Sequence, residues 1–63
     1  MKRAAVALTV TATYGPGRTR TLDGASPADA RAFIVAALRY EPRATFEIDG
    51  RAARPKPAGL WVN

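Results

Sequence analysis

The first regular pattern in the chain is a strict alternation of side-chain types over residues 4–14. One side of this segment is apolar, and the other side carries small uncharged residues. The apolar side consists of Val6, Leu8, Val10, Ala12 and Tyr14, and the other side of Ala5, Ala7, Thr9, Thr11 and Thr13. A period of two residues over this length predicts a β-strand with one buried face.

A Gly-Pro-Gly turn motif follows this strand and predicts a hairpin whose second strand spans residues 18–22. Two registers are open. If Tyr14 lay opposite Arg18, then Arg18 and Arg20 would share the apolar face, and burial of guanidinium groups without partners is costly. The other register pairs Thr13 with Arg18, covers the apolar face with threonine side chains and points both arginines outward. We expect this second register.

The clearest helix signal spans residues 27–41. Ser26 is a good N-cap, Pro27 fits the first helical position, and Asp29 completes a variant of the capping box. Spacings of three and four residues define an apolar stripe of Ala30, Phe33, Ile34, Ala37 and Leu38. The opposite side carries Arg31, Val35 and Arg39. Pro42 ends the helix, because it restricts the residue before it to extended geometry.

A second hairpin follows the helix. Residues 44–49 alternate again, Asp49-Gly50 is a strong signal for a two-residue turn, and a return strand spans residues 51–54. Its continuation contains Pro55 and Pro57, which cannot donate hydrogen bonds. We therefore expect this strand to be a sheet edge that ends early.

These elements predict one α+β domain over residues 1–63, a ββαββ unit in which one helix packs on one face of an antiparallel sheet. The apolar tail, residues 58–63, is expected to dock on the core or on a partner. The predicted core consists of Leu8, Val10, Phe33, Ala37, Leu38, Phe46 and Ile48.

The chain has few means of stabilising so small a core. It has 63 residues with no Cys and no His, which excludes disulfides and leaves carboxylates as metal ligands. We predict no metal site and no cofactor. Small domains without such supports often associate, and the uncharged face of the first strand would allow close approach of a second subunit. We therefore expect a homodimer or a chain stabilised by its partner.

Two further features bear on localisation. The apolar run after Lys2 and Arg3 is short and interrupted by threonines, so we do not interpret it as a secretion signal. No segment approaches the roughly 18 apolar residues of a membrane span. With the absence of Cys, this favours a cytoplasmic protein without membrane contact.

Charge is the strongest functional signal. Ten Lys and Arg against five Asp and Glu give a net charge of +5, which favours nucleic acid or an acidic protein as the partner. Eight of the cations are Arg, which a GC-rich genome would also produce without any function. The candidate nucleic-acid-binding residues, expected to form one basic rim, are Arg18, Arg20, Arg51, Arg54 and Lys56. No aromatic residue alternates with them as in a stacking platform for single strands.

Enzymatic function lacks its usual residues. The one Ser is explained by the helix cap, and no nucleophile–base constellation can be built without His or Cys. Glu47 and Asp49 imitate a carboxylate pair but are better explained as a solvated strand face. We therefore expect no catalytic residues, and two hypotheses remain. The first is a small nucleic-acid-binding or regulatory module, and the second is a protein-binding module or inhibitor, of phage or toxin–antitoxin type, with an acidic partner.

Overall fold

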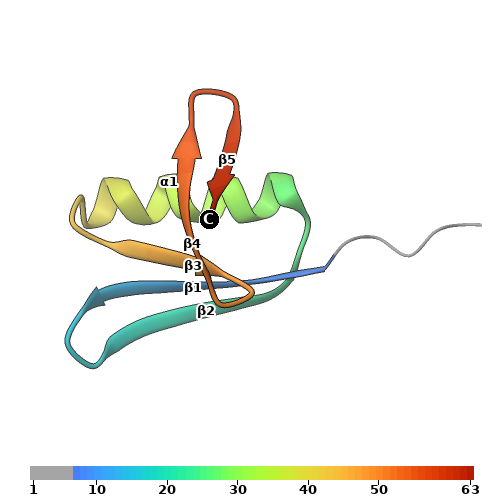
Figure 1. The fold of residues 1–63 in the computed structure, drawn as a ribbon. Coiled ribbons are helices and arrows are strands. Elements are labelled where there is room, and N and C mark those ends of the chain that lie inside the picture. Colours follow the sequence, from blue (N-terminus) through green and yellow to red (C-terminus); the bar gives the residue numbers. More distant parts are fainter. Residues whose placement is uncertain (1–6) are drawn as a thin grey trace, which may run out of the picture.

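The structure, a computed structural model, describes residues 7–63 and contains one sheet and one helix (Figure 1). The elements in chain order are β1 (Leu8–Gly15), β2 (Arg18–Ala25), α1 (Pro27–Tyr40), β3 (Thr45–Ile48), β4 (Arg51–Lys56) and β5 (Gly59–Val62). Residues 4–6 of the predicted first strand lie outside the described residues, as do Lys2 and Arg3. The α+β class is confirmed, with one more strand than the sequence predicted.

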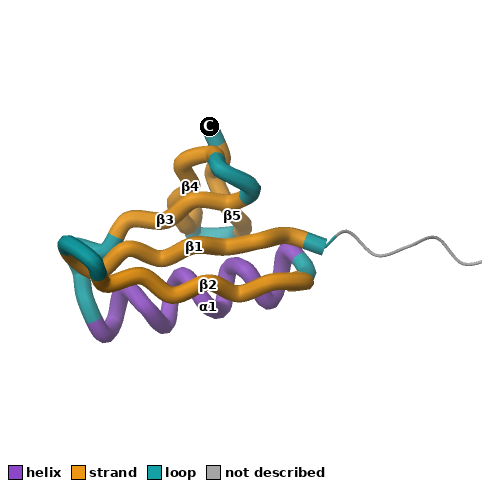
Figure 2. Tube along the Cα trace, turned by 90° about the horizontal axis from the view of Figure 1, so that it is seen from below, coloured by secondary structure: helices purple, strands orange, loops and turns teal. Residues whose placement is uncertain are grey.

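The sheet is antiparallel with the strand order β2-β1-β3-β4-β5. Helix α1 lies across one face of β1 and β2 (Figures 1 and 2). The β4–β5 hairpin turns away from the direction of the other strands and runs past the side of α1, which both of its strands contact (Figure 1). The helix is therefore held from two directions.

The core lies between α1 and the sheet and is built largely from small side chains. Its buried members are Val10, Ala12, Ala25, Ala30, Ile34, Ala37, Ala44, Phe46, Ile48 and Ala53. Leu8, Phe33 and Leu38, which the sequence also placed in the core, pack against this cluster while partly exposed. Alanines on both layers allow the helix to approach the strands closely, so a short chain can still exclude water from its centre.

The helix boundaries follow the predicted capping signals. Ser26 Oγ accepts a hydrogen bond from the backbone N–H of Asp29 at 3.1 Å, and Pro27 is the first helical residue. At the other end, Glu41 is extended with φ −139° and donates its N–H to the carbonyl of Ala37 at 2.8 Å. The helix thus ends one residue before the predicted boundary.

The predicted register of the first hairpin is wrong. Thr13 pairs with Thr19 and Ala12 with Arg20, because an irregularity between Thr13 and Gly15 places Tyr14 in a bulge. This register sets Leu22 opposite Val10, on the face that packs against the helix. Strand β2 is a sheet edge and Arg20 stays exposed there, so the burial cost assumed for its guanidinium does not arise.

The expectation that its prolines make the return strand an edge is also wrong. Strand β4 pairs with β3 through residues 51–53 and with β5 through residues 53–56. The N–H of Asn63 donates to the carbonyl of Ala52 at 2.8 Å, so residues 52, 54 and 56 are those whose backbone groups face β5. Pro55 lies between them and beyond the end of β3, where no N–H is required.

The Asp49-Gly50 turn forms as predicted, and Asp49 also ties β3 to β1. Both turn residues have positive φ, 52° and 81°, the geometry of a type I′ hairpin. The N–H of Asp49 donates to the carbonyl of Thr9 at 2.9 Å, and Asp49 Oδ1 accepts the N–H of Thr9 at 3.0 Å. The carboxylate therefore extends the β1–β3 ladder by one residue.

Arg31 fastens the β4–β5 hairpin to the helix. Its Nε donates to the carbonyl of Gly59 at 3.0 Å, and its Nη2 donates to the carbonyls of Lys56 at 2.6 Å and Pro57 at 3.1 Å. Gly59, whose carbonyl accepts from Nε, has φ 122°, a conformation that side chains rarely allow. On the helix side opposite the apolar stripe, the added hairpin thus covers Arg31, while Arg39 stays exposed.

Candidate functional site

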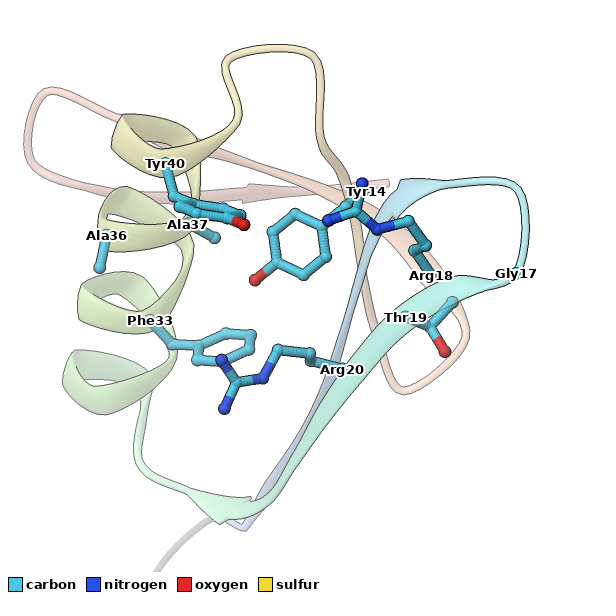
Figure 3. Close-up of a pocket in the computed structure, with 9 residues that line it drawn as sticks. All are labelled: Tyr14, Gly17, Arg18, Thr19, Arg20, Phe33, Ala36, Ala37 and Tyr40. Atoms are coloured by element: carbon cyan, nitrogen blue, oxygen red, sulfur yellow. The ribbon is translucent and has the colours of Figure 1, made fainter.

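A groove of about 690 Å³ runs between β2 and the second half of α1 (Figure 3). We call it the β2–α1 groove. Its walls are the β1–β2 turn and the edge strand on one side and the helix on the other. Its lining residues are Tyr14, Gly17, Arg18, Thr19, Arg20, Phe33, Ala36, Ala37 and Tyr40. Two of these side chains, Arg18 and Arg20, are charged, and both are positive, so the groove favours an anion.

The register of the hairpin places these two arginines in the groove. The bulge at Tyr14 turns Arg20 to the helix side of the sheet, and Arg18 follows at the end of the turn. Figure 3 shows Arg20 extending across the groove toward Phe33 and Arg18 lying on the strand side. Both residues are exposed, so their guanidinium donors are open to a ligand.

Aromatic side chains form the other part of the groove. The rings of Tyr14 and Tyr40 meet edge to face, with centroids 5.8 Å apart and an interplanar angle of 89°. Tyr40 is nevertheless 73% exposed. Phe33 lies on the same flank of the helix (Figure 3). Aromatic residues do not alternate with Arg18 and Arg20 along the sequence, but the fold places three aromatic rings in the same groove as these arginines.

Sequence reasoning missed this grouping, although part of its signal was present. Phe33, Ala37 and Tyr40 follow one another at helical spacing and so share one side of the helix. Tyr14 lies on the predicted apolar side of the first strand, and it packs partly buried against the core. Beyond the bulge, the register that brings Arg20 to the same side is the alternative that the burial cost of arginine argued against.

The other three candidate cations lie elsewhere, and the five do not form one rim. Arg51 pairs with Ile48 on the helix side and lines a separate hollow of about 750 Å³ near Leu60. Arg54 lies opposite Trp61 on the other face of the sheet, with its guanidinium carbon 5.7 Å from the ring centroid. Lys56 follows two residues later on that same face.

The two carboxylates considered as a pair have different surroundings. Asp49 accepts the backbone N–H of Thr9, whereas Glu47 is exposed on the outer face of the sheet. Among residues 7–63 no group of three or more acidic, Cys or His side chains is arranged to hold a metal ion. Charged residues of the neighbouring strands flank the outer face of β1. Thr9 Oγ1 donates to Asp23 Oδ1 at 3.1 Å, and Glu47 pairs with Thr11.

Comparisons with known proteins add no identity. No protein family, curated protein or solved structure matches this chain. In residues 7–63, the helical segment is neither long nor apolar enough to cross a membrane.

Proposed function

We propose that this protein is a small module that binds single-stranded nucleic acid in the β2–α1 groove. The observation that carries the proposal is the meeting of two exposed arginines and three aromatic rings in one groove. Guanidinium groups make bidentate contacts to phosphate and give affinity without sequence preference. Aromatic faces add stacking with any base.

Each residue has a distinct role in this proposal. Arg18 and Arg20 contact successive phosphates along the strand side of the groove. Tyr40, the most exposed of the three rings, stacks on a base, while Tyr14 supports it from the edge. A duplex would not use this arrangement, because its bases are stacked on one another and offer no free face. The proposal therefore predicts a preference for single strands.

The proposal is tested with a fluorescent oligonucleotide and anisotropy measured across a salt series. Replacing both Arg18 and Arg20 by Gln should lower the logarithmic salt slope by roughly 1.4, since each phosphate contact to a single strand contributes about 0.7. Tyr40→Ala should weaken binding about 5- to 150-fold, as expected for one lost stacking contact, and leave the salt slope unchanged. Duplex of the same sequence should bind more weakly than the single strand.

The matched control is the triple change Arg51→Gln, Arg54→Gln and Lys56→Gln, which removes more charge but none from the groove. Because these cations lie outside the groove, the triple change should lower the salt slope by much less than the groove pair does. If the triple change lowers the slope and the groove pair does not, the groove is not the site. If an acidic peptide binds and the oligonucleotide does not, the partner is an acidic protein and the proposal fails.

A further inference from the structure

Two edges bound the sheet within residues 7–63, and they differ in how well they are protected. Strand β2 carries Arg18 and Arg20, and its ladder with β1 has two irregularities. Charges and bulges of this kind prevent pairing with another strand. Strand β5 has no charged residue and no proline, and its ladder with β4 is regular. It also exposes two large apolar side chains, Trp61 at 42% and Val62 at 43%.

The backbone groups that β5 leaves free follow from its ladder with β4. The hydrogen bond from Asn63 to Ala52 shows that residues 59, 61 and 63 direct their backbone groups to β4. Leu60 and Val62 lie between them, so their N–H and C=O groups point to the open edge. Each of these residues offers one donor and one acceptor to another strand.

We propose that β5 pairs with β5 of a second copy of this chain, in antiparallel orientation about a two-fold axis at Trp61. In this register Leu60 of each copy lies opposite Val62 of the other, and each such pair exchanges two hydrogen bonds. The arrangement uses every free backbone group of the two residues. The result is one continuous sheet through both copies.

The side chains fit the same register. Trp61 shares the outer face with Arg54, so the two indoles meet at the axis, where side chains of a non-hydrogen-bonded pair approach most closely. Leu60 and Val62 lie on the helix side, opposite Pro55 and Ala53, and would join the two cores. A second copy therefore covers both exposed apolar side chains of β5.

Charge determines how this dimer depends on salt. Each copy carries +5, so the copies repel one another and screening by salt should strengthen the dimer. The edge is short, and small interfaces of this kind are weak. Oligonucleotide binding in the groove has the opposite salt dependence, so the two associations can be measured and can fail independently.

The test is sedimentation equilibrium over concentrations from about 1 µM to 1 mM, with fluorescence of the single Trp recorded in parallel. The mass should rise toward twice that of the chain, and the Trp emission should shift to shorter wavelength over the same range. Raising the salt concentration from about 0.05 to 0.5 M should lower the dissociation constant several-fold. A monomer throughout the range overturns the proposal.

Two variants separate this edge from other contacts. Val62→Pro removes an N–H that points to the open edge and leaves the bonds to β4 intact. Val62→Lys adds a like charge near the axis without changing the backbone, and guards against misfolding by proline. Both should stay monomeric with unshifted emission, while the control Thr11→Lys, on the outer face of β1, should dimerise as the wild type does. If dimers survive both Val62 changes but not Thr11→Lys, the interface lies on the outer face of β1, and the proposal of pairing through β5 is refuted.

Discussion

Arg31 and Arg20 are the same residue type, one on the helix and one on the sheet edge that faces it, and they have different surroundings. Arg31 projects from the helix to the β4–β5 turn, where it is half-buried and donates to three carbonyl oxygens. Arg20 projects from the sheet edge toward the helix, where it is exposed and lies beside Phe33 (Figure 3). One guanidinium closes the fold, and the other is open to solvent.

The difference comes from what each guanidinium meets. It offers five N–H donors and accepts nothing, so it becomes structural where backbone carbonyls already converge. Residues 56–59 around the β4–β5 turn, with Gly59 in a conformation that favours glycine, supply such carbonyls to Arg31. The β2–α1 groove presents aromatic rings and alanines to Arg20 instead. A basic chain can therefore contain some cations that hold the fold together and others that are free to bind a ligand, and the net charge alone does not tell them apart.

The largest expected effect is the loss of Arg31. Arg31→Ala leaves three turn carbonyls without their charged donor, and we expect the free energy of unfolding to fall by about 2–3 kcal/mol. Domains of this size have only about 3–9 kcal/mol in total, so the β4–β5 hairpin should separate from the helix at low denaturant. Urea titration followed by Trp61 fluorescence measures this change.

Two variants sharpen that result. Arg31→Lys keeps the charge and one point of attachment, and should recover part of the lost stability. Arg39→Ala, in the last turn of the same helix, removes an exposed arginine and should cost less than about 1 kcal/mol, the scale of an interaction with the helix dipole. Equal losses for Arg31→Ala and Arg39→Ala would mean that the turn contacts do not stabilise the fold.

The same contrast holds for two carboxylates, with a smaller effect. Asp49→Ala removes the acceptor of the Thr9 N–H and places alanine at a positive φ, so we expect a loss of about 1–2 kcal/mol in chemical denaturation. Asp49→Asn keeps an acceptor and tolerates this conformation, and should cost little. Glu47→Gln, on the exposed face, is the control and should change stability by less than about 0.5 kcal/mol. A strong effect of Glu47→Gln would contradict this division.

Local patterns predicted the local structure well. The helix from Pro27, its Ser26 cap and the Asp49-Gly50 turn all depend on residues a few positions apart, and all three form. Strand β5 was missed because its four residues are too few to show a period. Pro55 also suggested that β4 could not pair on a second side, although the ladder between β4 and β5 needs no N–H from residue 55. Alternation along a strand tells which residues share a face, but not which other strands pair with it.

The groove could be predicted only in its helical half. Phe33 and Tyr40 share a flank by spacing, but Arg20 reaches them through a bulge that shifts the register by one residue. The cost of burying arginine, on which the expected register rests, applies to an interior strand, whereas β2 is an exposed edge. The packing of Leu22 opposite Val10 also favours the observed register.

The smallest effect tests that register directly. With Arg20 on the helix side, Arg20→Leu should add apolar contact with Phe33 and raise the free energy of unfolding by about 0.5–1 kcal/mol, while oligonucleotide binding falls. Thr21→Leu, one position further on the outer face, should give no such gain. The register expected from the sequence, with both arginines outward, predicts the reverse order for the two variants. A chain that gains stability as it loses affinity would show that Arg20 occupies its place for binding rather than for folding.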